Sequence, residues 1–286
     1  MLHEVKNLMN NKRHLIALDL DGTLLTDKKE ISPRTKEIIF NAKKAGHIVV
    51  IATGRPHRAS IDYYNELHMD TPMVNFNGAL IHHPQNNKWD ALHTPLPKET
   101  ALSVVETCYE LNVHNILAEI EDHVFLDQYD EEIINLFQDD GQESPFTIGS
   151  LKNELRDDPT SLLIHPKEDH IGQLRSHLNE HHAEVIEHRK WGAPWNIIEI
   201  VKKGLSKAVG LQKIAHYYHI PQERIIAFGD EDNDLEMIDY AGVGVAMGNA
   251  IDELKAIAKH VTTTNEQDGV GTFLESYFNI GVKTHI

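Results

Sequence analysis

Residues 15–23 of the chain read LIAL followed by DLDGT, so an apolar run ends abruptly in two aspartates, a glycine and a threonine. Four apolar residues in succession are typical of a strand that is buried on both faces of a parallel sheet. We predict that this strand covers residues 14–18 and that Asp19 and Asp21 lie just beyond its carboxyl end. In an open parallel sheet, ligands bind beyond that end of the strands, near the point where the strand order reverses.

The neighbouring segments continue with alternating helices and strands. Ser32 and Pro33 are typical of an N-cap and a first helical position, and Gly46 is typical of a residue that follows a helix. The pattern predicts helices over 33–45 and 56–67 and strands over 47–52 and 73–76. It resumes after residue 205, with helices over 206–218, 233–241, 251–258 and 273–278 and strands over 224–228, 243–246 and 260–263. This alternation predicts an α/β fold built on a doubly wound, Rossmann-like parallel sheet.

The middle of the chain breaks the alternation. We expect here a hairpin over 78–93, helices over 98–111 and 168–181, strand-like runs over 115–126, 161–165, 184–188 and 196–201, and polar, irregular chain over 138–158. A mixture of hairpins and helices indicates an α+β insertion. We therefore predict a discontinuous core of residues 1–82 and 202–286, interrupted by a smaller domain of residues 83–201.

Two further strands of the predicted core also end in polar residues. Thr53 and Gly54 follow the second strand, and the sequence GDEDND, residues 229–234, follows the strand over 224–228. Lys207 lies at the start of the helix that precedes this last strand. Because the carboxyl ends of parallel strands meet at one edge of a sheet, we expect these side chains to gather there.

The gathered residues have the chemistry of a phosphate site with a metal. Asp19 and Asp230 offer carboxylate oxygens without a cysteine or histidine pattern nearby, which favours Mg²⁺. The donors suited to phosphate oxygens are Thr53, the backbone N–H of Gly54, Lys207 and Asn233. Asp19 can then attack phosphorus as a nucleophile, and Asp21, if protonated, can donate to the leaving oxygen and later activate water.

Each feature also has a purely structural interpretation. Asp and Gly are common in turns after strands, and acidic residues such as 230–234 are favoured at a helix N-terminus. Lys207 stands close to Lys202 and Lys203, and most lysines are simply solvated. The occurrence of all these features at three strand ends of one chain favours the functional interpretation.

Together, the four motifs closely resemble the haloacid dehalogenase-like superfamily of phosphohydrolases. They are Asp19-Leu-Asp-Gly-Thr23, Thr53, Lys207 and Gly229-Asp-Glu-Asp-Asn-Asp234. The insertion after the third core strand, and the sequence VNFNG at residues 74–78 that leads into it, are similar to the Cof subfamily with its α+β cap domain. The resemblance covers nearly the whole chain and implies that residues 83–201 form this cap.

The resemblance also implies a role for each matching residue. Asp19 would be the nucleophile and a metal ligand, and Asp21 the acid/base whose backbone carbonyl also binds the metal. Asp230 would complete the protein ligands to Mg²⁺, with Asp234 behind them. The residues implied in holding phosphate are Leu20, Thr53, Gly54, Lys207 and Asn233.

We therefore expect a Mg²⁺-dependent phosphatase that works through an aspartyl-phosphate. The resemblance includes members that act on sugar phosphates and on the ribityl-phosphate precursor of riboflavin, so we expect a small phosphorylated metabolite as substrate. A phosphomutase of the same superfamily is an alternative, which would return the phosphoryl group to its product. A receiver-type signalling module also places aspartates, Thr and Lys around Mg²⁺, but it has no insertion of this length.

Composition excludes other partners. The 286 residues include 27 basic and 44 acidic side chains, a formal charge of −17, which argues against nucleic acid and against anionic membrane surfaces. No apolar run approaches the roughly 20 residues that cross a bilayer, and the N-terminal sequence lacks the apolar segment of a secretory signal. A single cysteine, Cys108, fits a reducing compartment, so we expect a cytoplasmic protein. Its helix carries an apolar stripe, so we expect Cys108 in the core.

Other conspicuous residues yield weaker predictions. Trp191, Trp195 and Asn196, near the return from the insertion, are candidates for substrate contact. The pairs His82-His83 and His181-His182 do not have a zinc-binding spacing. Residues 242–248, GVGVAMG, miss the dinucleotide-binding spacing by one residue and are read as a strand–helix turn. Arg55 has two interpretations, an anion contact or a salt bridge.

Overall fold

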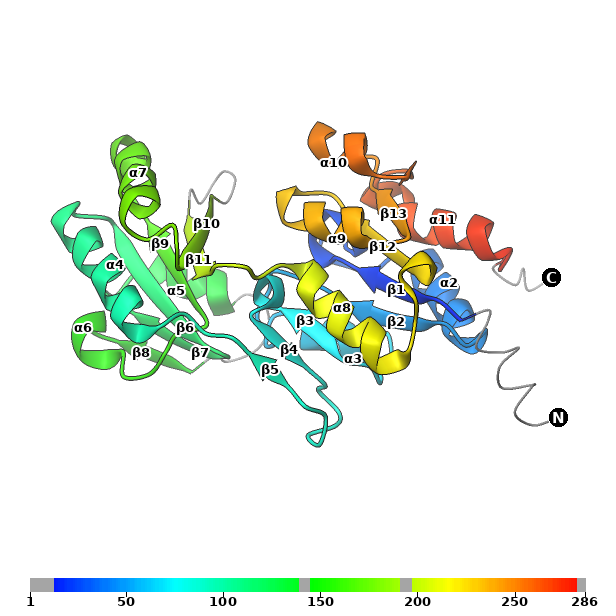
Figure 1. The fold of residues 1–286 in the computed structure, drawn as a ribbon, viewed down its shortest axis with the longest axis horizontal. Coiled ribbons are helices and arrows are strands. Elements are labelled where there is room, and N and C mark those ends of the chain that lie inside the picture. The colour runs from blue at the N-terminus through cyan, green and yellow to red at the C-terminus, as the bar shows by residue number, and fades with distance from the viewer. Residues whose placement is uncertain (1–12, 139–144, 191–196, 282–286) are drawn as a thin grey trace. The chain divides into compact units, whose positions relative to one another are not determined.

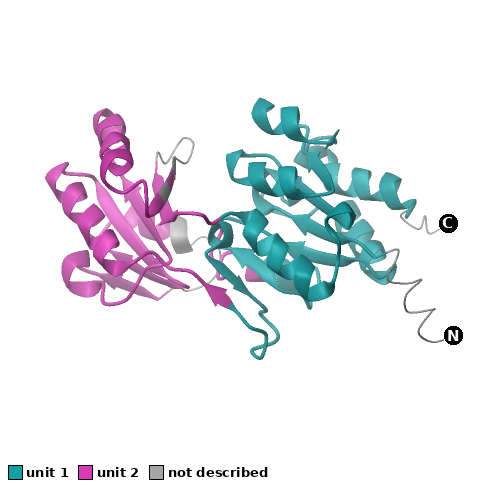
Figure 2. Cartoon of the chain, viewed as in Figure 1, with its two compact units in different colours: residues 1–54, 62–91, 206–286 teal, residues 55–61, 92–205 magenta. Residues whose placement is uncertain are grey.

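The computed structural model describes residues 13–138, 145–190 and 197–281, which form two compact units (Figure 2). The core unit comprises residues 1–54, 62–91 and 206–286, and the inserted unit comprises residues 55–61 and 92–205. The sequence-based division at 82/83 and 201/202 thus lies a little before these boundaries. In the described ranges, no helix combines the length and the hydropathy of a membrane span.

A five-stranded parallel sheet forms the centre of the core unit, in the order β14-β13-β12-β1-β2 (Figure 1). Its strands are β1 (Leu15–Leu18), β2 (Ile48–Ile51), β12 (Ile225–Gly229), β13 (Val243–Ala246) and β14 (His260–Val261). Leu15 of β1 is in register with Ile225 of β12 on one side and with Ile48 of β2 on the other. All four residues of β1 are buried, as the apolar run predicts. The predicted parallel α/β core is confirmed.

The strand order reverses between β1 and β12. Because β2 lies on one side of β1 and the later strands lie on the other, right-handed connections place α2 and α9 on opposite faces of the sheet. Helix α11 packs against α2, whereas α8 and α10 pack against α9 (Figure 1). The bounds of these helices, and of α3, are α2 (Pro33–Lys44), α3 (Ile61–Glu66), α8 (Lys207–Tyr218), α9 (Leu235–Tyr240), α10 (Asp252–Ile257) and α11 (Gly269–Phe278).

Helix boundaries follow local hydrogen bonding. The side chain of Ser32 accepts a hydrogen bond from the backbone N–H of Thr35, so the predicted N-cap of α2 is confirmed. The predicted helix over 56–67 is wrong in its first half, where the chain forms a turn in which the backbone N–H of Ser60 donates to the carbonyl of His57 at 3.0 Å; α3 begins only at Ile61. The last helix begins at Gly269, four residues earlier than predicted.

Strand β3 (Met73–Asn75) continues the sheet beyond β2. A parallel bridge joins Ala52 to Val74, and the backbone N–H of Thr53 donates to the carbonyl of Val74 at 2.9 Å. β3 then pairs antiparallel with β4 (Leu80–His82) across a tight turn at residues 76–78. Helix α8 packs closely on this strand, since a Cβ at Gly210 would overlap the Val74 side chain.

The inserted unit contains a six-stranded sheet in the order β10-β11-β9-β6-β7-β8, in which only β7 and β8 pair in parallel. Alternate residues of β6 face opposite sides: Ile116 packs with helices α4 (Lys98–Glu110), α6 (Leu151–Glu154) and α7 (Ile171–His181), and Leu117 packs with Ile133 of α5 (Glu131–Gln138). Cys108 of α4 is buried in the first of these clusters, as predicted. The strands of this sheet are β6 (Asn115–Ile120), β7 (His123–Leu126), β8 (Phe146–Ile148), β9 (Ser161–His165), β10 (Ile186–Lys190) and β11 (Ile198–Lys202). The short strand β5 (Leu92–His93) does not belong to it.

Two parts of the inserted unit differ from the sequence-based expectation. Helix α5 was not predicted, and the region expected to be irregular contains β8 and α6. All three elements are short, and tertiary packing rather than a long apolar period defines them.

Candidate active site

Asp19 lies directly after β1, in the centre of the sheet edge. Its side chain is buried, and its backbone carbonyl accepts from the N–H of Leu24, which closes a one-turn loop of residues 20–24. Within this loop Gly22 has a φ of +70°, and a Cβ there would overlap the carboxylate of Asp230. Glycine is therefore required at this position both for its backbone conformation and for the close approach.

Asp230 follows β12, the neighbour of β1, so its carboxylate faces the same edge. The hydroxyl of Thr23 donates to its Oδ1 at 2.8 Å. The amide of Asn249 donates to the carbonyl of Gly22 at 2.8 Å and lies 3.4 Å from Oδ2 of Asp230. These contacts join the loop after β1 to the end of β12.

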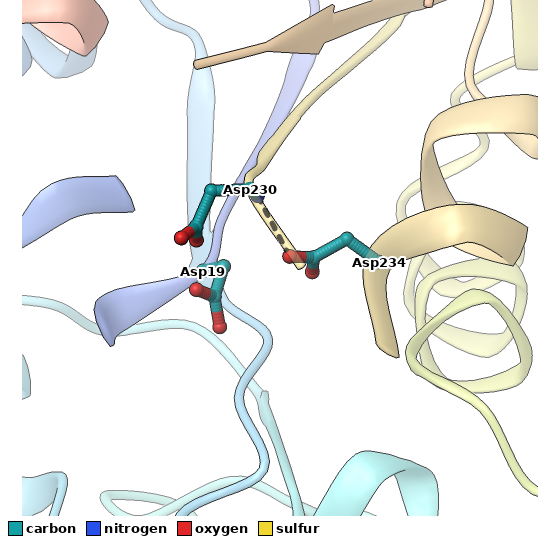
Figure 3. Close-up of side chains that lie close together, drawn as sticks. All are labelled: Asp19, Asp230 and Asp234. Atoms are coloured by element: carbon teal, nitrogen blue, oxygen red, sulfur yellow. Dashed lines mark hydrogen bonds between the residues drawn. The ribbon is translucent and has the colours of Figure 1, made fainter. Parts of the chain in front are cut away.

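Lys207, at the first position of α8, is completely buried and connects two carboxylates. Its Nζ donates to Oδ1 of Asp19 at 2.6 Å and to Oδ1 of Asp234 at 2.8 Å. The other oxygen of Asp234 accepts from the backbone N–H of Asp230 at 2.9 Å, the contact drawn in Figure 3. Of the lysines weighed from the sequence, Lys207 is thus the one that reaches the aspartates.

The charges of this cluster are unbalanced. Burial raises the pKa of Asp19 well above its ordinary value; Lys207 opposes this rise, and the carboxylates of Asp234 and Asp230 add to it. Burial, and next the Asp234 carboxylate, raise the pKa of Asp230 to about 7. Burial alone would lower the pKa of Lys207, but the carboxylates of Asp19 and Asp234 outweigh it and raise this pKa. Three carboxylates therefore share one ammonium group.

The donor set fits a hard divalent cation. Asp19, Asp230 and Asp234 each place one oxygen within 4.8 Å of the others, and all three are buried (Figure 3). Among the described residues no other group of three or more His, Cys, Asp or Glu side chains is brought together in this way. Lys207 and a backbone N–H engage both oxygens of Asp234, whereas the oxygens of Asp230 accept from the side chains of Thr23 and Asn249. Such all-oxygen sites suit Mg²⁺.

Asp21 lies apart from the buried cluster. Its side chain is 42% exposed, and one oxygen is 2.6 Å from Nζ of Lys29. The structure therefore leaves Asp21 at the solvent-facing side of the loop, where it forms an ion pair that the sequence did not predict.

The predicted phosphate donors occupy the ends of β2 and β12. Thr53 is buried beside β3, and Gly54 packs against the amide of Asn77. The side-chain N–H of Asn233, in the short 3-10 turn Asp232–Asp234, donates to Oδ1 of Asn77 at 3.1 Å. Backbone and side-chain donors from two strand ends are thus tied together around Asn77.

The remaining sequence candidates are Arg55 and three residues near the return from the insertion. Arg55 donates to the carbonyl of Ala59. Trp191, Trp195 and Asn196 lie outside the described residues.

Conversely, sequence reasoning missed the contribution of Asn249. It follows β13 by three residues, so the rule that ligand-binding residues lie beyond strand ends would have found it.

Comparison with known proteins gives consistent matches over more than nine tenths of the chain. A family model described as haloacid dehalogenase-like hydrolase matches residues 16–274. The 5-amino-6-(5-phospho-D-ribitylamino)uracil phosphatase YitU of Bacillus subtilis is 53% identical over 272 residues, which cover 95% of this chain and 100% of that protein. The pyridoxal phosphate phosphatase YbhA of Escherichia coli is 32% identical, covering 92% of this chain and 98% of its own. Among solved structures, a haloacid dehalogenase-like hydrolase from Bacteroides thetaiotaomicron has a TM-score of 0.82 at 28% identity, over 93% of this chain and 100% of its own.

Proposed function

Because the chain belongs to the haloacid dehalogenase-like hydrolases and is a phosphatase of the Cof type, we propose that it hydrolyses a ribityl phosphate at the Asp19 site. The observation that carries the assignment of this site is the buried contact of Lys207 with Asp19, beside Asp230. The substrate to test first is 5-amino-6-(5-phospho-D-ribitylamino)uracil, because the 53% identical relative is named for it. Sugar phosphates and pyridoxal phosphate are the next candidates.

The proposed reaction has two steps at phosphorus. In the first, a carboxylate oxygen of Asp19 forms a bond to phosphorus while the bond to the ester oxygen breaks, and Asp21 gives this oxygen its proton. In the second, Asp21 takes a proton from water, the water oxygen bonds to phosphorus, and the Asp19 oxygen leaves. The products are an alcohol and inorganic phosphate, and both aspartates return to their starting states.

The surrounding residues prepare this reaction. Lys207 holds Oδ1 of Asp19 at 2.6 Å, which directs the other oxygen of the carboxylate to phosphorus. Thr53, Gly54, Asn233 and the backbone at Leu20 are proposed to hold the phosphate oxygens. Asp21 has to leave the ion pair with Lys29 before it can serve as the acid. Mg²⁺, held by Asp19, Asp230 and the backbone carbonyl of Asp21, would supply positive charge against the phosphate and the nucleophile.

We propose that the inserted unit acts as the cap that recognises the leaving group and excludes water. Trp191, Trp195 and Asn196 remain candidates for this recognition. We also propose a cytoplasmic location, since the single cysteine is a buried, free thiol of the kind expected in a reducing compartment.

A screen of phosphorylated metabolites with Mg²⁺, read by released phosphate, tests the proposal. Release of phosphate in the absence of a bisphosphate activator is expected and excludes the phosphomutase. The Asp19→Asn variant should fold and lose turnover, because the side-chain amide cannot replace the carboxylate in forming the aspartyl-phosphate. Appreciable turnover by this variant would contradict the assignment of Asp19 as the nucleophile. Full activity after treatment with EDTA would contradict the requirement for a metal.

A further inference from the structure

The turn between β3 and β4 has an unusual backbone. Phe76, Asn77 and Gly78 have φ values of +49°, +52° and +102°, so three consecutive residues are left-handed. Glycine adopts this conformation freely and asparagine tolerates it, but it is rare for a bulky residue such as phenylalanine. Strain of this kind persists where the surrounding structure over-determines the backbone, often at a functional site.

The contacts of this turn reach the proposed phosphate donors at the ends of β2 and β12 and the residue before Lys207. The backbone N–H of Asn77 donates to the carbonyl of Thr53 at 3.2 Å, and a Cβ on Gly54 would lie 3.2 Å from the Asn77 amide atoms. The side chain of Asn77 is 4% exposed and accepts the hydrogen bond from Asn233. Gly78 lies so close to the backbone of Ser206, the residue before Lys207, that any Cβ would overlap it.

We propose that Asn77 is a positioning residue for phosphate binding, an inference that rests on the proposed phosphatase function and deepens it. Oδ1 of Asn77 holds one N–H of the Asn233 amide, which fixes the amide plane and gives its second N–H a constant direction. The backbone of Asn77 fixes the carbonyl of Thr53 and thereby the peptide that leads to Gly54. Asn77 thus aligns donors from the ends of β2 and β12 for one phosphoryl group.

The Asn77→Gly variant separates a role of Asn77 in positioning the phosphate donors from a role in shaping the turn alone. Asn77→Gly keeps the left-handed backbone and removes only the amide, so the turn should survive while the contact with Asn233 is lost. Asn112, exposed after α4 with a φ of +49°, offers a matched control, since Asn112→Gly makes the same change far from these contacts along the chain. Asn77→Asp keeps the acceptor oxygen but adds a negative charge beside the phosphate.

The experiment compares the wild type with these three variants. It measures KM and kcat for a hydrolysed phosphate ester, the inhibition constant of inorganic phosphate, the activation constant of Mg²⁺ and the melting temperature. For Asn77→Gly we expect KM and the phosphate constant to rise about 5- to 10-fold, the effect of one lost hydrogen bond. The Mg²⁺ constant should stay at its wild-type value, and the melting temperature should fall only by the small amount that one lost hydrogen bond costs. Asn77→Asp should weaken phosphate binding more than Asn77→Gly does, and Asn112→Gly should leave all of these quantities unchanged.

Two results would overturn the inference. One is a wild-type phosphate constant in Asn77→Gly, and the other is an equal rise of the phosphate and Mg²⁺ constants, which indicates general loosening of the site. If the wild type releases phosphate but Asn77→Gly is unaffected, only this inference fails. A wild type that neither releases phosphate nor binds it would overturn the proposed function and this inference together.

Discussion

Replacing Asp230 with asparagine should stabilise the metal-free protein while abolishing its response to Mg²⁺. Asp230 lies buried within 4.8 Å of two other carboxylates, and only one ammonium group compensates the three charges. Asparagine has nearly the same shape and can still accept the hydrogen bond from Thr23. The substitution therefore removes a repelling charge and leaves the packing almost unchanged.

The magnitude follows from the pKa of Asp230, which burial raises from 3.8 to about 7. At about 1.4 kcal/mol for each pH unit, ionising Asp230 above pH 7 costs the folded state on the order of 4 kcal/mol. Some of this gain is lost, because the new amide would face the Nδ2 of Asn249 at 3.4 Å, donor against donor. Allowing about 1–2 kcal/mol for that conflict, we expect a net stabilisation of roughly 2–3 kcal/mol.

The stabilisation by Asp230→Asn should increase with pH. The raised pKa means that the folded protein retains a proton that the unfolded chain loses, so ionisation of Asp230 destabilises the fold progressively as pH rises from 3.8 to about 7. The difference in stability between Asp230→Asn and the wild type should therefore be small at pH 4 and reach its full value above pH 7.

Urea unfolding in EDTA at pH 5 and pH 8 measures the effect. Asp157→Asn, an exposed aspartate of the inserted unit, is the control and should change neither stability nor the Mg²⁺ response. Added Mg²⁺ should raise the melting temperature of the wild type through ligand linkage and leave that of Asp230→Asn unchanged. A variant less stable than the wild type at pH 8 in EDTA would refute the electrostatic reasoning. A preserved Mg²⁺ shift would refute the ligand assignment.

Three further changes test other parts of the structure. Lys207→Ala should lower kcat for phosphate release by about 10²–10³-fold, as loss of a preorganised charge donor does, and a loss below about tenfold would contradict its role. Gly22→Ala should cost about 1–2 kcal/mol of stability for its left-handed backbone and should raise the Mg²⁺ activation constant, because its Cβ displaces Asp230; an unchanged constant would contradict the close approach. The contribution of His47 to stability should be lost as pH drops from 6.5 to about 4, opposite in sign to that of Asp230, because burial lowers the pKa of His47 to about 4 and its Nδ1 accepts from the N–H of His14. The stability difference between wild type and His47→Gln should therefore shrink between pH 6.5 and 4, and a difference that does not change with pH would contradict this assignment.

The strand ends that gather at the site could be predicted because each depends on a local signal. The buried strands are short, apolar runs, and one topological rule then brings their polar successors together. The contact of Lys207 with Asp19, residues 188 positions apart, is the strongest example. Short elements such as α5 and β8 escaped prediction because tertiary packing rather than a long periodic pattern defines them.

The residues that organise the site were harder to foresee. Asn77 and Asn249 act through amide hydrogen bonds to backbone and to neighbouring side chains, and a single asparagine carries no periodic or charge signal. The rejected dinucleotide pattern of residues 242–248 ends directly before Asn249. Its glycines account for the strand–helix turn, and they carry no signal for the hydrogen bonds that Asn249 makes. The ion pair of Asp21 with Lys29 was missed for a different reason, since loop side chains eight residues apart have no fixed spacing.

The net charge of −17 first argued against partners that carry phosphate, and the site refines that argument. Its three carboxylates and one ammonium group leave a buried excess of negative charge, which by itself would repel a phosphate dianion. The same excess is what favours a divalent cation, and the cation with Lys207 would then reverse the sign where phosphate binds. An acidic chain can therefore serve a phosphate substrate if its buried aspartates first recruit a metal. In the metal-free protein, repulsion among these carboxylates lowers the free energy of unfolding, as predicted for Asp230. This loss of stability accompanies a site whose charge favours a metal.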